Sequence, residues 1–142
     1  MEVRRDRYLD SLKDRMHNGM IKVVTGVRRC GKTYLLFELF GGYLSAELGI
    51  DDDHIIEVAL DEEANRGLRD PGALDAYLRS RITDKASQYY VMLDEVQYAI
   101  SDNELRKDEP PRLYGVLNGL LRMRNVDVYV TGSNSKLLST DV

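Results

Sequence analysis

The sequence has few of the residues that build disulfides or zinc sites, with one cysteine and two histidines in 142 residues. One cysteine excludes an internal disulfide framework and is typical of the reducing cytoplasm. Two isolated histidines and one cysteine argue against a zinc site. No apolar run approaches the roughly 20 residues of a membrane span, and the charged residues 1–6 lack the apolar segment of a secretory signal. These absences predict a cytoplasmic protein without a membrane segment.

Basic residues are not in excess either, because the formal net charge is −4. A protein that binds nucleic acid by itself usually shows a strongly basic face, so nucleic acid is not indicated as a partner. The length is that of one domain. The apolar fraction of 43% and the charged fraction of 31% are those of a globular chain.

The most informative segment is residues 26–33, which follow an apolar strand-like run. Its sequence, Gly-Val-Arg-Arg-Cys-Gly-Lys-Thr, fits the phosphate-binding pattern G-x-x-x-x-G-K-[ST]. Successive backbone N–H groups in such a loop form an anion-binding nest, and the N-terminus of the following helix adds further donors. We expect Lys32 to reach the β- and γ-phosphates and the Thr33 hydroxyl to bind Mg²⁺.

Apolar strand-like runs alternate with helical periodicity along the rest of the chain. We expect strands over 21–25, 55–60, 89–94 and 126–131, and helices over 3–17, 32–48, 71–86 and from 113 onward. Residues 101–109 are charged and without periodicity, and predict a mobile surface loop. The alternation predicts an α/β domain with a mainly parallel sheet, whose ligands bind at the carboxyl ends of the strands.

Acidic and polar residues follow these predicted strand ends. Asp94 and Glu95 come directly after an apolar strand, where Asp94 is placed to hold Mg²⁺ and Glu95 to polarise an attacking water. Asn134 follows the last strand in Thr-Gly-Ser-Asn-Ser, either as a turn residue or as an amide that contacts the γ-phosphate or the water. Gln97 fits a plain polar surface residue better than a sensor of nucleotide state.

These three motifs together resemble AAA-superfamily P-loop ATPases, and more narrowly the prokaryotic group with a C-terminal domain of unknown function. The resemblance implies strand order 5-1-4-3-2. It also implies that Glu95 is the catalytic base, that Lys32 is a catalytic residue that binds phosphate, and that Asn134 is sensor 1. Thr33 and Asp94 would be the metal ligands. The nucleotide-binding residues it implies are Gly26, Val27, Arg28, Arg29, Cys30, Gly31, Lys32, Thr33 and Tyr34. Arg28 and Arg29 fit phosphate neutralisation, a role across an interface, or surface ion pairs.

The chain departs from this family by ending before the fifth strand, the helical lid and the expected arginine residues. We therefore expect residues 1–142 to be the front part of a longer protein, with the first strand at the edge of the sheet and in contact with another chain or copy. ATP is the default nucleotide because no guanine-binding Asn-Lys-x-Asp motif is present. ATP hydrolysis that drives a C-terminal region or partner is the first hypothesis. A nucleotide-dependent switch with little hydrolysis is the second, and a small-molecule kinase is the third.

Overall fold

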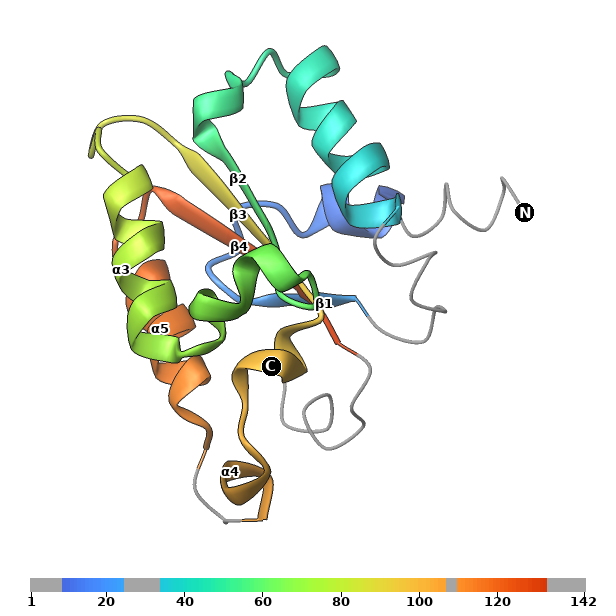
Figure 1. The fold of residues 1–142 in the computed structure, drawn as a ribbon. Helices are drawn as coiled ribbons and strands as arrows, with labels where there is room; N and C mark the ends of the chain where they lie inside the picture. Colours follow the sequence, from blue (N-terminus) through green and yellow to red (C-terminus); the bar gives the residue numbers. More distant parts are fainter. Residues whose placement is uncertain (1–8, 25–33, 107–109, 133–142) are drawn as a thin grey trace.

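The computed structural model describes residues 9–24, 34–106 and 110–132 (Figure 1). Residues 9–14 are helical, and a second helical segment covers residues 34–47, wound mainly as π-helix over Tyr34–Phe40 and Tyr43–Glu47. The other helices are α3 (Pro71–Arg81), α4 (Asp102–Arg106) and α5 (Arg112–Leu121), with 3-10 turns at Asp52–His54, Glu63–Arg69 and Val96–Ala99. The strands are β1 (Lys22–Val24), β2 (Ile55–Ala59), β3 (Tyr89–Asp94) and β4 (Val126–Thr131).

These four strands form one sheet in the order β1-β4-β3-β2, and every neighbouring pair is parallel. The order agrees with the 1-4-3-2 part of the order implied by the family resemblance. The bounds predicted for β3 and β4 are confirmed, because both strands are apolar runs buried on both faces. Helices cover both faces of the sheet, with α3 and α5 on one and segment 34–47 on the other (Figure 1). The domain is therefore a three-layer α/β fold.

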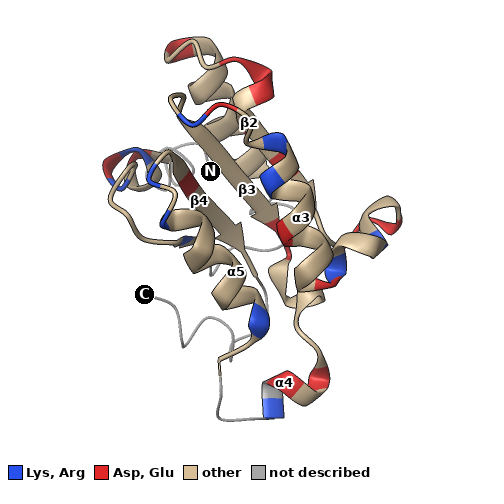
Figure 2. Ribbon diagram, turned by 90° about the vertical axis from the view of Figure 1, so that its left-hand side faces the viewer, with Lys and Arg blue, Asp and Glu red and all other residues tan. Residues whose placement is uncertain are grey.

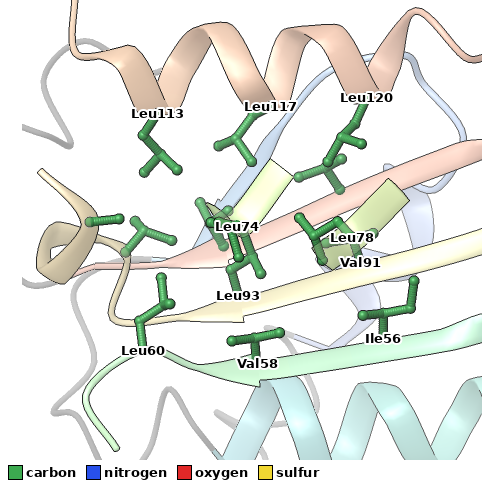
Figure 3. Packing of buried hydrophobic residues seen from close by; sticks show 14 of the residues in the cluster. Ile56, Val58, Leu60, Leu74, Leu78, Val91, Leu93, Leu113, Leu117 and Leu120 are labelled. Atoms are coloured by element: carbon green, nitrogen blue, oxygen red, sulfur yellow. The ribbon is translucent and has the colours of Figure 1, made fainter. Parts of the chain in front are cut away.

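One hydrophobic core lies between the sheet and the pair α3 and α5 (Figure 3). Leu113, Leu117 and Leu120 of α5 point from one side of the helix toward the sheet. Their spacing of three and four residues places them on one helical face. Alternate strand residues, such as Val91 and Leu93, meet them because side chains alternate between the two faces of a strand. This core holds the carboxyl ends of β2 and β3 in a defined position.

A second core lies on the opposite face, where Phe40 of segment 34–47 packs against Tyr129 of β4 with ring centroids 4.6 Å apart. Gly41 lies inside the helical segment and is buried. A Cβ added to Gly41 would lie 2.9 Å from Oε2 of Glu57 on β2. That oxygen is the far end of a flexible, exposed side chain that can move aside, and the other neighbours of this Cβ lie at 3.6 Å or more.

The predicted loop over 101–109 is corrected in part, because Asp102–Arg106 form the short helix α4. Ser101 and Glu104 explain the helix. The Glu104 backbone N–H donates to Ser101 Oγ at 3.2 Å, and the Ser101 N–H donates back to Glu104 Oε1 at 3.0 Å. This reciprocal pair is a capping box, which the Ser-x-x-Glu spacing encodes. Likewise, α3 ends at Arg81 and not near residue 86.

A buried polar network joins β1 and β4 on the face of the second core. The Lys22 ammonium pairs with the Asp127 carboxylate, and both residues are almost fully buried. Asp127 Oδ2 also accepts from the Tyr129 hydroxyl at 2.6 Å and from the His17 backbone N–H at 2.9 Å. His17, with φ of +61°, thereby attaches the end of the N-terminal helical segment to the sheet.

Within the described ranges, none of the helices combines the length and the apolar character needed to cross a membrane.

Candidate functional site

The candidate site lies at the carboxyl edge of the sheet, where β3 ends in Asp94 and β4 ends in Thr131. The strand register pairs Leu93 with Val130, so Asp94 and Thr131 follow side by side. Both are buried, with relative exposures of 2% and 0%. The parallel sheet thus places a carboxylate and a hydroxyl next to each other from segments 37 residues apart.

Asp94 is held from two directions. Its Oδ1 accepts a hydrogen bond of 2.5 Å from the Thr131 hydroxyl, and its backbone carbonyl accepts from the Leu60 N–H at 3.0 Å. A carboxylate on a rigid strand, oriented by a second residue, meets the requirement of a divalent-cation ligand. A carboxylate oxygen is among the ligands that Mg²⁺ takes in proteins.

Glu95 directly follows the strand and adopts a left-handed backbone conformation, with φ of 57° and ψ of 56°. Such a conformation costs a residue with a side chain about 1–2 kcal/mol, and strained residues of this kind cluster at functional sites. The Glu95 N–H donates to Thr131 Oγ1 at 2.9 Å, and its Oε1 accepts from Gln97 Nε2 at 2.8 Å. The backbone and the side chain of this glutamate are both fixed.

Sequence reasoning missed two residues of this site. Thr131 contacts Asp94 and Glu95 at once through one hydroxyl, which donates to the carboxylate and accepts from the backbone N–H. Gln97, interpreted as a plain polar surface residue, contacts the Glu95 carboxylate instead. Placing Thr131 required the register between β3 and β4, whereas the short spacing between Gln97 and Glu95 was visible in the sequence.

β1 ends at the same edge of the sheet, and the phosphate-loop sequence follows this strand in the chain. Its last described residue, Val24, pairs with Thr131, and the motif begins at Gly26. The predicted nucleotide-binding residues 26–33, among them Lys32 and Thr33, and the predicted sensor Asn134 lie outside the described residues. Tyr34 lies at the start of the helical segment 34–47, with 42% of its surface exposed. β1 is separated from β3, which carries Asp94, by the strand β4.

The acidic residues at the end of β2 are not drawn into this arrangement by any contact that the structure describes. The Glu63 carboxylate forms an exposed ion pair with Arg66 on its own 3-10 turn. An exposed pair of this kind contributes little to stability. Asp94 and Glu95 are the carboxylates that the described part of the fold holds rigidly at this edge.

A parallel sheet of this order, flanked by helices on both faces, defines a P-loop NTPase-like α/β domain. The sequence model of the AAA domain family matches residues 18–142. This chain belongs to the AAA domain family, whose members are nucleotide-binding domains of the ATPase type. The family match confirms the resemblance drawn from the three motifs.

Two curated relatives are similar along most of the chain. An uncharacterized protein of Haemophilus influenzae is 26% identical over 140 residues, which cover 99% of this chain and 32% of that protein. The uncharacterized protein MJ1544 of Methanocaldococcus jannaschii is 29% identical over 126 residues, which cover 86% of this chain and 23% of that protein. The chain spans a third or less of the length of these relatives.

Proposed function

We propose that this domain binds ATP together with Mg²⁺ and hydrolyses it, with Glu95 as the general base. The observation that supports this most is the joint fixation of Asp94 and Glu95 by Thr131, next to the strand that leads into the phosphate-loop sequence. Glu95 is strained and is held at both its backbone and its carboxylate, and strained residues cluster at functional sites. In ATP hydrolysis, Glu95 would serve as the general base.

Each predicted residue has a role in this proposal. The loop residues 26–33 and Tyr34 bind the nucleotide, and Lys32 contacts its phosphates. Thr33 and Asp94 would hold Mg²⁺, which when bound neutralises charge on the phosphate oxygens. Glu95 accepts a proton from the attacking water. Asn134 orients that water or contacts the γ-phosphate.

We further propose that residues 1–142 act as the ATPase part of a larger machine, in which hydrolysis changes the conformation of a C-terminal region or a partner protein. The span of the relatives, three or more times the matched length, supports this. The outer edge of β1 is the proposed place of contact with another chain or copy, because β1 pairs with β4 alone among the described strands.

Nucleotide titration and phosphate release test the proposal together. ATP and ADP are titrated with and without Mg²⁺, and phosphate release is followed for the wild type, Glu95→Gln and Lys32→Ala. We expect Glu95→Gln to keep ATP binding and to lower phosphate release by about 10²–10⁴-fold, the usual contribution of a general base. We expect Lys32→Ala to lose binding. The exposed residues Glu47 and Lys85 provide the matched controls Glu47→Gln and Lys85→Ala.

Different results would contradict different parts of the proposed function. Binding that survives Lys32→Ala would remove the phosphate-loop assignment. Phosphate release that is unaffected by Glu95→Gln would remove the base. ATP binding by the wild type without phosphate release would replace the ATPase by a nucleotide-dependent switch, and phosphate transfer to an added small molecule would revive the kinase hypothesis.

A further inference from the structure

A cleft of about 530 Å³ lies beside the candidate site, between the start of α3, the turn that follows Glu95 and the start of α5. Arg69, Tyr98, Asn103 and Arg112 line it, and Pro71 and Ile100 contribute apolar surface. Figure 2 shows α4, with its acidic residues, and a basic residue at the near end of α5 at the same end of the molecule. The proposed hydrolysis uses none of the residues that line this cleft.

The two carboxylates that line the cleft already accept hydrogen bonds from nearby backbone N–H groups. Glu104 Oε1 accepts from the Ser101 N–H, and its Oε2 accepts from the Arg112 backbone N–H at 3.0 Å. The hydrogen bonds from the backbone of Arg112 and Ser101 lower the pKa of Glu104 below its ordinary value. Asp70 caps α3 by accepting from the Ala73 N–H at 2.9 Å. Both carboxylates therefore serve the local fold.

The basic side chains keep donors for a ligand. Arg112 is exposed, and its guanidinium lies 3.9 Å from Asp70, which is a loose ion pair. Arg69 donates through Nε to the Leu60 carbonyl at 2.8 Å, and its guanidinium carbon lies 4.8 Å from the centre of the Tyr98 ring. Tyr98 is 46% exposed. The cleft thus offers guanidinium groups beside an accessible aromatic ring.

We propose that this cleft binds an acidic segment of a partner protein, with a glutamate or aspartate carboxylate on Arg112 and a neighbouring aliphatic side chain against Tyr98. A guanidinium binds a carboxylate through parallel N–H donors, and an aromatic ring beside arginine is a common anchor in protein interfaces. A nucleic acid fits less well, because its row of phosphates needs an extended basic surface, and Arg69 and Arg112 are the two basic residues that line the cleft.

The cleft is joined to Glu95 by one short turn. The Tyr98 N–H donates to the Glu95 carbonyl at 3.1 Å, and Gln97, the residue before Tyr98, holds the Glu95 carboxylate. A peptide that orders Tyr98 therefore also orders the contact between Gln97 and Glu95. This coupling rests on the proposed ATPase activity: peptide binding raises the rate of phosphate release, whereas the binding itself does not depend on hydrolysis.

Fluorescence anisotropy with a labelled peptide of alternating glutamate and leucine tests the binding. We expect saturable binding below about 1 mM, the range of a weak specific contact, and no binding of the same peptide with lysine in place of glutamate. Arg112→Gln weakens binding by about tenfold, as loss of a hydrogen bond to a charged group does. Tyr98→Ala weakens binding as well. Tyr98→Phe keeps the ring and should bind the peptide like the wild type. Arg122→Gln, at the far end of α5, is the matched control.

Binding that is equal for the lysine peptide, or unchanged by Arg112→Gln, would overturn the proposed site. So would displacement of the peptide by a single-stranded oligonucleotide at lower concentration than by unlabelled peptide. Phosphate release is measured with the same peptide present. Peptide binding without a change in the rate of an active enzyme overturns the coupling. Peptide binding to a protein that releases no phosphate under any condition supports the site and contradicts the proposed function.

Discussion

At the scale of single residues, the candidate site depends on two side chains that have no chemistry of their own in the proposed reaction. Thr131 fixes Asp94 and the backbone of Glu95, and Gln97 fixes the Glu95 carboxylate. A general base must be held within hydrogen-bonding distance of the proton that it accepts. Gln97 is therefore a positioning residue in this proposal, and its effect appears through Glu95.

Gln97→Ala is expected to lower kcat for ATP hydrolysis by about tenfold and to leave ATP binding unchanged. A hydrogen bond to a charged group contributes about 1.5–3 kcal/mol, of which part is recovered by water. Steady-state phosphate release and a nucleotide titration measure the two quantities. Gln88→Ala, at the opposite end of β3, is the matched control. Equal kcat in Gln97→Ala and the wild type would show that Gln97 does not position the base.

Tyr129 makes the stability of the fold sensitive to alkaline pH. Burial, and the hydrogen bond to Asp127, raise the pKa of Tyr129 far above its ordinary value of 10.0. Because the pKa of Tyr129 is raised in the folded protein, its contribution to the free energy of unfolding is complete below pH 10. This contribution is lost as the pH rises above 10, where the tyrosine ionises in the unfolded chain but not in the folded one. The free energy of unfolding should fall more steeply above pH 10 in the wild type than in Tyr129→Phe. The difference in slope rises toward about 1.4 kcal/mol per pH unit as the pH passes 10, measured by urea unfolding between pH 9 and 11. Parallel slopes would contradict this.

At the scale of elements, Asp127 joins β1, β4 and the end of the N-terminal helical segment. Its carboxylate accepts from the Lys22 ammonium, the Tyr129 hydroxyl and the His17 backbone. A buried ion pair is a poor source of net stability, because desolvation offsets the attraction between the charges. Its consequence is specific pairing of β1 with β4, since any other register would leave both charges buried and unpaired.

Asp127→Ala is expected to lower the free energy of unfolding by about 3–5 kcal/mol, because it leaves the Lys22 charge buried without a partner. The double variant Lys22→Met with Asp127→Leu should be more stable than Asp127→Ala alone. Urea unfolding followed by circular dichroism measures all three proteins. Asp75→Ala, which removes an exposed ion pair with Arg79, is the control and should cost less than about 1 kcal/mol. A double variant that is less stable than Asp127→Ala would contradict this account.

At the scale of the whole molecule, the described sheet has two edges, β1 and β2. Parallel sheets normally have covered faces, but an edge strand offers a row of hydrogen-bonding groups to another chain. β1 is short and lies next to the candidate site, so a chain that adds to it would also approach the nucleotide. The proposed contact with a partner or second copy belongs to this edge.

The 142-residue chain is therefore expected to associate as its concentration rises. Light scattering over a concentration series measures the mass, and hydrogen exchange locates the contact. Amides of residues 22–24 should exchange more slowly in the associated form, whereas those of the β2 edge, residues 55–59, provide the internal control and should not change. A monomer at every concentration, with fast exchange over 22–24, would count against the edge contact.

Local sequence patterns were sufficient for most of the fold. β3 and β4 were bounded correctly because each is a mainly apolar run between polar residues, and α5 was found because its leucines repeat with helical spacing. The predicted order of the strands came from the family resemblance. The expected loop at 101–109 was wrong for α4, although Ser101 and Glu104 have the spacing of a capping box. The absence of apolar periodicity outweighed that signal.

The sequence by itself determined the class of the protein, because residues 26–33 form a phosphate-binding pattern from contiguous residues whose backbone groups need no distant partner. It also placed Asp94 and Glu95 at a strand end, since an apolar run followed by two acids is a local pattern. Only the tertiary structure decided which side chains hold them. Thr131 reaches Asp94 through the register of parallel strands, and Lys22 and Asp127, more than a hundred residues apart, are the single charged residues of two otherwise mainly apolar strands and pair with each other. Contacts of this kind depend on alignment between segments, and no single segment encodes that alignment.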